Sequence, residues 1–373
     1  MNSLILLERL NAAQRLLAAS DCDAWLVSCP ENRRYLSGFS ALDGQLNESS
    51  GYLLFSGEVA WLLTDFRYRE WAAQEAPYFE VIVYPEGLAK VLPELIGKLG
   101  CRRLGFEAPF LTFYQYQKFA GAVAEAGLEV EWKPLEGLLE ELREVKDAEE
   151  INNLKQALAL TEAGLAAVQA QLREGLREQE IAWLVERQLR ESGAEALSFP
   201  TIVASGPNSA RPHHHPGERP IQAGEPIIID LGARFQGYCA DMTRTFVLGE
   251  PDERFKEVYG VVRTAQKTAE DGIRAGMLSD AADGLARQVI SDAGYGEYFG
   301  HSLGHGVGLA VHERPSLSPL KERATPLKAG MVATVEPGIY LPGWGGVRLE
   351  DMILIHEDRA EVLNADRNFY RFD

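Results

Sequence analysis

Two aspartates near the middle of the chain could hold a cation between them. In the segment IIIDLGARFQGYCADMTRTF, Asp230 ends an apolar run and Asp241 lies on the next expected strand. If Phe235 and Gln236 form the tip of a hairpin, Asp230 lies directly opposite Asp241. Two carboxylates about 5 Å apart on neighbouring strands repel each other unless a cation or a proton lies between them. Alone, such a pair is more often two ordinary solvent-facing strand residues.

Three further segments carry residues of the same chemical kind. The glycine-rich segment GHSLGHGVGLAVHE contains His301, His305 and His312; TVEPGIY places Glu336 at a strand end, and GVRLEDM places Glu350 on the next strand. Each of these residues alone is weak evidence. The glycines could instead cradle a phosphate, but no Walker-type lysine follows and nearby carboxylates would repel that ligand.

Together these segments supply a ligand set for two metal ions. The set has four carboxylates and one imidazole: Asp230, Asp241, Glu336, Glu350 and His305. Two divalent ions would neutralise the carboxylates, and oxygen-rich coordination with one nitrogen suits manganese, cobalt, iron or zinc better than it suits a tetrahedral structural zinc site. Because two metals can share a water and polarise a carbonyl, hydrolysis is the expected chemistry.

These segments resemble the pita-bread metallopeptidases, the family of methionine aminopeptidases, aminopeptidase P and prolidase. The resemblance covers roughly residues 145–355, with all five ligand segments in the family's order. It implies that Asp230 binds one metal, that His305 and Glu336 bind the other, and that Asp241 and Glu350 bridge both. We expect two divalent ions per subunit, with manganese the first choice and cobalt, zinc or iron as alternatives.

The proline-specific branch of this family is favoured by two features. ENRRYLSGF and TDFRYRE resemble its creatinase-like N-terminal domain, which methionine aminopeptidases generally lack. The segment ASGPNSARPHHHPGE resembles its histidine loop, so that the active-site histidine falls on His213. His214 and His215 then have no matching role, and the three adjacent histidines could also be a fortuitous metal-binding tract.

The resemblance also assigns catalytic roles. His312 matches a second family histidine near the substrate, and Arg348 matches an arginine that orients the site, a role compatible with a salt bridge to a ligand carboxylate. Glu336 would take a proton from the bridging water. His213 and His312 would stabilise the oxyanion and help to protonate the leaving proline nitrogen.

One departure from the family pattern bears on the length of peptide that the enzyme prefers. Many proline-specific relatives read H-E-x-P-R after the histidine loop, and that arginine can reach the free carboxylate of a dipeptide. Here the segment is HERPS, which places Ser316 there, although Arg314 and Arg323 lie nearby. A serine cannot supply the geometric specificity of a fixed arginine. We therefore predict an aminopeptidase P-like enzyme, with prolidase as the alternative and a methionine aminopeptidase or a non-catalytic peptide-binding module less favoured.

The elements that position these residues fall into two domains. Residues 1–140 alternate a helix at 4–19 with strands at 24–28, 52–55 and 60–64, which predicts an α/β, creatinase-like domain. Residues 145–373 are predicted to form an α+β pita-bread domain with a curved antiparallel sheet. Its expected helices are 149–172, 178–191, 252–274 and 279–293, and its expected strands are 201–204, 227–231, 237–247, 331–336 and 347–355.

Composition limits the partners. The net charge of −18 argues against nucleic acid and against an anionic membrane surface. No apolar run is long enough to span a bilayer, and the four cysteines are scattered, as in a cytoplasmic protein with reduced thiols. We expect a cytoplasmic homodimer, as is common among the related enzymes, acting on peptides with proline at the second position.

Overall fold

The structure is a computed structural model that describes residues 3–45 and 48–372. The chain divides after Arg143 into two compact units, which we call the N-terminal unit and the C-terminal unit. The four cysteines are free thiols, as the sequence predicts.

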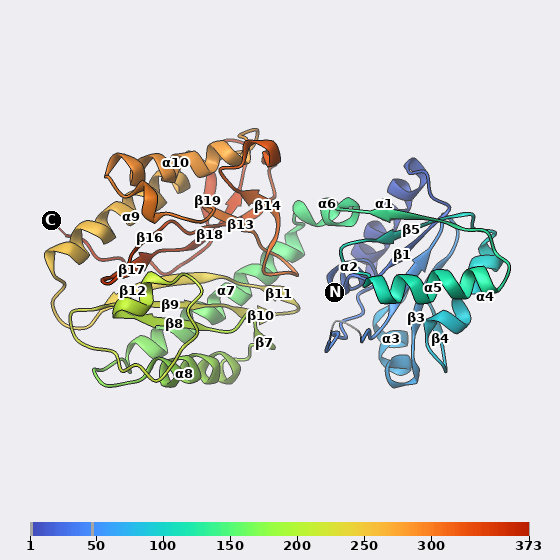
Figure 1. Ribbon diagram of the computed structural model, residues 1–373, viewed down its shortest axis with the longest axis horizontal. Helices are drawn as coiled ribbons and strands as arrows, with labels where there is room; N and C mark the ends of the chain where they lie inside the picture. Colours follow the sequence, from blue (N-terminus) through green and yellow to red (C-terminus); the bar gives the residue numbers. More distant parts are fainter. Residues whose placement is uncertain (1–2, 46–47, 373) are drawn as a thin grey trace. The chain divides into compact units, whose positions relative to one another are not determined.

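The N-terminal unit is a mixed sheet flanked by helices (Figure 1). Its strand order is β4-β3-β2-β1-β5-β6, and its central strands are buried along their whole length because both faces of the sheet are covered. The strands are β1 (Ala24–Val27), β2 (Tyr52–Phe55), β3 (Ala60–Thr64), β4 (Glu80–Val83), β5 (Arg103–Glu107) and β6 (Glu131–Leu135). The helices are α1 (Ser3–Ala19), α2 (Pro30–Ser37), α3 (Arg69–Glu75), α4 (Leu88–Leu99), α5 (Phe113–Glu125) and α6 (Leu138–Glu144), so the predicted α/β character is confirmed.

The C-terminal unit consists of antiparallel strands between helices. Figure 1 shows α8 on one side of the strands and α9 and α10 on the opposite side. Its helices are α7 (Ala148–Gln169), α8 (Glu178–Glu191), α9 (Glu253–Gly272) and α10 (Ser279–Asp292). Helix α7 begins with a capping box, in which Asp147 and Glu150 each accept a hydrogen bond from the other's backbone amide.

The strands of this unit pair into several antiparallel groups, β12-β9-β8, β14-β13-β15-β18-β19, β16-β17 and β11-β10-β7. They are β7 (Ala196–Leu197), β8 (Ile202–Ser205), β9 (Pro226–Leu231), β10 (Ala233–Phe235), β11 (Tyr238–Cys239), β12 (Met242–Val247), β13 (Gly304–Gly306), β14 (Glu313–Leu317), β15 (Val332–Val335), β16 (Gly338–Leu341), β17 (Gly345–Arg348), β18 (Asp351–Ile355) and β19 (Ala360–Val362). This is the predicted α+β architecture.

The register predicted for the hairpin around Asp230 is wrong. Phe235 pairs with Tyr238, so the tip is Gln236–Gly237, and both tip residues have positive φ, at 48° and 80°. That is the two-residue turn that the twist of a hairpin favours and that glycine allows at little cost. Asp230 consequently pairs with Thr243 and not with Asp241. Asp230 and Asp241 nevertheless lie near each other, since the charge of Asp230 raises the pKa of Asp241.

Breaks between strands carry three of the predicted ligands. Asp241 lies between β11 and β12, and Glu336 directly follows β15 as predicted. The single strand predicted over 347–355 is wrong, because β17 pairs with β16 while β18 pairs with β15, and Glu350 lies in the break between them. A carboxylate at such a break is not confined to the strict up-and-down alternation of a continuous strand.

Candidate active site

Asp241, His305 and Glu350 form the centre of the candidate site. Each offers a ligand atom, and these atoms lie within 4.8 Å of one another. Asp230 and Glu336 flank this group, since the charges of both raise the pKa of Asp241. The Nε2 atom of His305 is 3.3 Å from Oε1 of Glu336 and 3.6 Å from Oδ2 of Asp241. The structure therefore brings the five predicted ligand residues together from separate segments.

The site holds more buried negative charge than its own cations balance. Burial raises the pKa of Asp230, and it raises the pKa values of Asp241 and Glu350 well above their ordinary range. Neighbouring carboxylates add to each of these shifts, while Arg348 opposes them. Carboxylates packed in this way stay ionised together only with a cation among them.

The hydrogen bonds of Asp230 also indicate a cation-binding site. Its Oδ2 atom accepts a hydrogen bond of 2.6 Å from Nη2 of Arg348. Its Oδ1 atom is buried and has no hydrogen-bond partner among the described residues. Leaving a buried carboxylate oxygen unpaired is costly. This oxygen and the oxygen-rich donor set with one imidazole fit a pair of divalent metal ions.

The ring of His305 is oriented so that Nε2 points to the carboxylates. Its Nδ1 atom lies 3.0 Å from the carbonyl oxygen of Gly306, so Nδ1 carries a proton, and Nε2 can act as a metal ligand once the ring is neutral. The Thr334 hydroxyl accepts a hydrogen bond from the His305 amide and donates one to Glu336. Thr334 therefore fixes the spacing of two predicted ligands.

Glu336 differs from the other carboxylates because cationic groups surround it. Burial acts to raise its pKa, but the hydrogen bond and charge of His305 and the charges of His301 and Arg348 outweigh burial and lower the pKa to about 2. Burial likewise acts to lower the pKa of His305, and Glu336 outweighs it and raises that pKa. Glu336 is therefore an ionised carboxylate that can accept a proton.

Arg348 connects the ligands to the histidine loop. Besides Asp230, its guanidinium donates to the Thr243 hydroxyl (3.1 Å), the Tyr340 hydroxyl (3.1 Å) and the carbonyl oxygen of Pro212 (3.3 Å). Thr243, the cross-strand partner of Asp230, in turn donates to Oε2 of Glu350 at 2.6 Å. One planar side chain thus joins both sides of the site, which a lysine could not do.

His312 and His213 lie beside the metal-type ligands. The ring of His312 packs against that of His305, with centroids 4.2 Å apart. Burial lowers the pKa of His312, and the charges of His305 and His213 lower it further. The side chain of His213 is exposed, and the residue before it is held by Arg348.

The sequence did not reveal the contacts that Tyr340 and Glu178 make at the site. Tyr340, buried on β16, bonds to both Arg348 and Nε2 of His301. The only signal for Tyr340 was its place in TVEPGIY, four residues after Glu336. His214 does not join a histidine metal tract, because its Nε2 atom is 2.8 Å from Oε2 of Glu178.

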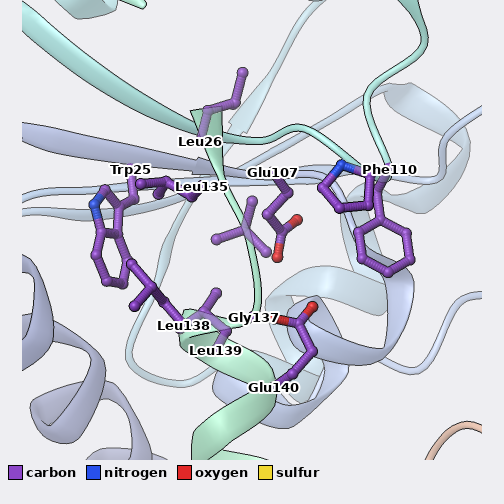
Figure 2. A pocket seen from close by; sticks show the side chains of 11 residues that line it. Trp25, Leu26, Glu107, Phe110, Leu135, Gly137, Leu138, Leu139 and Glu140 are labelled. Atoms are coloured by element: carbon purple, nitrogen blue, oxygen red, sulfur yellow. The ribbon is translucent and has the colours of Figure 1, made fainter. Parts of the chain in front are cut away.

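A small pocket lies in the N-terminal unit, away from these residues in the sequence (Figure 2). Glu107 and Glu140 line it together with apolar residues such as Trp25 and Leu135. Burial raises the pKa of Glu107 to about 7. The backbone amides of Ser28 and Cys29, which donate hydrogen bonds to its Oε2 atom, act in the opposite direction. This pocket holds the two carboxylates of Glu107 and Glu140 and none of the histidines or clustered ligands of the candidate site.

The fold and the ligand geometry define a metallopeptidase of the two-domain type. The model of metallopeptidase family M24 matches residues 152–357, and that of the creatinase/prolidase N-terminal domain matches residues 9–145. The chain belongs to metallopeptidase family M24. This confirms the predicted pita-bread fold and the prediction of a metallopeptidase, and the N-terminal domain argues against a methionine aminopeptidase.

Similar proteins match nearly the whole chain. An Xaa-Pro dipeptidase from Pyrococcus furiosus is 37% identical over 95% of this chain and 97% of its own length. Among solved structures, an Xaa-Pro dipeptidase from Bacillus anthracis has a TM-score of 0.88 at 38% identity, covering 98% of both chains. An X-Pro aminopeptidase from Thermotoga maritima has a TM-score of 0.84 at 36% identity, covering 94% of this chain and 98% of its own.

Proposed function

We propose that the protein is an Xaa-Pro dipeptidase, a prolidase, which hydrolyses the bond in front of proline. The observation that carries this proposal is the cluster of Asp241, His305 and Glu350, flanked by Asp230 and Glu336, in a chain that matches Xaa-Pro dipeptidases along nearly its whole length. The sequence led us to favour an aminopeptidase P-like enzyme, and the similarity favours the dipeptidase alternative instead. Aminopeptidase activity remains the second candidate because Ser316 replaces the family arginine and because an X-Pro aminopeptidase is nearly as similar.

The metal ligands are assigned as the family resemblance implies. Asp230 would hold one ion, His305 and Glu336 the other, and Asp241 and Glu350 both. Manganese is the first choice, with cobalt, zinc or iron as alternatives. When bound, the ions polarise the scissile carbonyl and activate the attacking water.

The protein's own groups move protons and hold the substrate. Glu336 accepts a proton from the attacking water, because its carboxylate is ionised and fixed by Thr334. His312 and His213 donate hydrogen bonds to the developing oxyanion and help to deliver a proton to the leaving proline nitrogen. Arg348 fixes the position of Asp230 relative to the histidine loop.

The remaining proposals concern the domain boundaries, the substrates and partners, the cellular location and the oligomeric state. We propose a creatinase-like domain of residues 1–140 and a catalytic domain of residues 145–373. Peptides with proline at the second position would be the substrates, and neither a nucleic acid nor a membrane would be a partner. Of the helices within residues 3–45 and 48–372, none combines the length and apolar character needed to cross a bilayer. We propose a cytoplasmic homodimer.

The test compares specificity constants. An Xaa-Pro dipeptide and its Xaa-Pro-Yaa extension are assayed at fixed pH and metal, because the ratio of kcat/KM values reports differential binding of the transition states. The proposal predicts a clear preference for the dipeptide. A preference for the longer peptide would transfer the assignment to aminopeptidase P, and hydrolysis of neither would overturn the function.

A further inference from the structure

The histidine loop is held on both sides of His213. We define this loop as residues 205–217, which begin at the last residue of β8. The carbonyl oxygen of Pro212, before His213, accepts a hydrogen bond from Arg348. The ring of His214, after His213, bonds to Glu178 at 2.8 Å. The exposed His213 therefore lies between two residues that buried charged side chains hold in place.

Glu178 holds the loop through hydrogen bonds to both of its carboxylate oxygens. Its side chain has no exposed surface, and it is the first residue of α8, where the helix dipole favours a carboxylate. Its Oε1 atom accepts hydrogen bonds from the amide and hydroxyl of Ser205, both at 2.9 Å, and from Nδ2 of Asn208 at 3.0 Å. Its Oε2 atom accepts from the amide of Gly217 at 3.2 Å and bonds to His214. Both ends of the loop and its middle thus meet at one carboxylate.

The direction of the bond to His214 follows from the charge of Glu178. Burial acts to raise the pKa of Glu178, but the hydrogen bonds from Asn208, His214 and Ser205 outweigh it and lower the pKa. An ionised carboxylate can only accept hydrogen bonds, so Nε2 of His214 is the donor. A charge-assisted bond of this kind is stronger and more directional than a neutral one.

We propose that His214 is a positioning residue, whose bond to Glu178 fixes the backbone that presents His213 to the substrate. This inference rests on the proposed function, in which His213 contacts the reacting group. It also gives a role to the second histidine of the tract, for which the family resemblance supplies none. His215 is the natural comparison, because its side chain is exposed and has no hydrogen bond among the residues that the structure describes.

The size of the expected effect follows from geometry. Displacing a catalytic group by about 1 Å can cost about a hundredfold in rate. We expect His214→Ala to lower kcat/KM for an Xaa-Pro dipeptide by roughly tenfold to a hundredfold. His214→Gln should recover most of this loss, because its amide Nε2 can replace the imidazole donor. The matched control, His215→Ala, should stay within about twofold of the wild type.

A double-mutant cycle separates positioning from general structural support. If His214 acts through His213, adding His214→Ala to His213→Ala should change kcat/KM by less than about twofold. An equal loss in both backgrounds would show that His214 acts elsewhere and would overturn the inference. Wild-type activity in His214→Ala would overturn it as well.

Amide hydrogen exchange over residues 205–217 makes the test independent of the proposed substrate. His214→Ala should speed exchange in this loop, whereas His214→Gln and His215→Ala should not. If the wild type cleaves no Xaa-Pro peptide, the proposed function fails, and the exchange measurement alone decides whether the bond orders the loop. Unchanged exchange in His214→Ala would contradict the inference whatever the activity.

Discussion

Arg348 donates a 2.6 Å hydrogen bond to the carboxylate of Asp230, and both side chains are buried. The same guanidinium reaches the Pro212 carbonyl, so the position of a predicted ligand and that of the histidine loop depend on one residue. Arg348 also donates hydrogen bonds to the hydroxyl groups of Thr243 and Tyr340. Each of these contacts uses a different N–H direction of the planar guanidinium group of Arg348.

Arg348→Lys should therefore lower kcat/KM strongly even though the charge is kept. A lysine can reach Asp230 but cannot hold Pro212, Tyr340 and Thr243 together. We expect a loss of roughly a hundredfold or more, the scale of a misplaced catalytic constellation. Steady-state kinetics measure it, with the exposed Arg359→Lys as the control. Activity near that of the wild type would show that the charge alone suffices.

Asp241→Asn should abolish activity and lower bound metal. A bridging carboxylate serves both ions, and its loss leaves surplus positive charge in the site. Elemental analysis of the purified protein measures the metal, and Asp358→Asn at an exposed position is the control. Two metals per subunit with near-normal turnover would refute the bridging assignment.

His213→Ala separates a catalytic helper from a ligand. The variant should keep most of its metal yet lose roughly two to four orders of magnitude in turnover, the scale of losing a positioned proton or oxyanion partner. Turnover and metal content are measured on the same sample. Loss of metal would place His213 among the ligands and make the five-ligand set incomplete.

Glu107 should make stability depend on pH. Burial raises its folded pKa from 4.5 to about 7, so between these values the folded state binds more protons than the unfolded state. Stability then falls as pH rises through this window, by up to about 3 kcal/mol at 1.36 kcal/mol per pKa unit. Chemical denaturation at a series of pH values measures this slope, which Glu107→Gln should flatten. An unchanged slope would assign the pH dependence to another group.

The sequence predicted the chemistry better than the geometry. The five residues proposed as ligands could be selected from the sequence because their types and order match motifs that are local features of the chain. The hairpin register was wrong because Gln236 adopts a positive φ, which moves the tip by one residue. The contacts of Tyr340 with His301 and of Glu178 with His214 were missed because they join residues 39 and 36 positions apart in the sequence, and no periodic pattern records such pairs.

The most direct test of the account is a metal titration of the metal-free protein. Protein stripped by a chelator is titrated with Mn²⁺ while hydrolysis of an Xaa-Pro dipeptide and bound metal are measured on the same samples. We predict no hydrolysis without metal and full activity at two bound ions per subunit. Full activity without metal, or saturation at one ion, would contradict the dinuclear site formed by Asp230, Asp241, His305, Glu336 and Glu350.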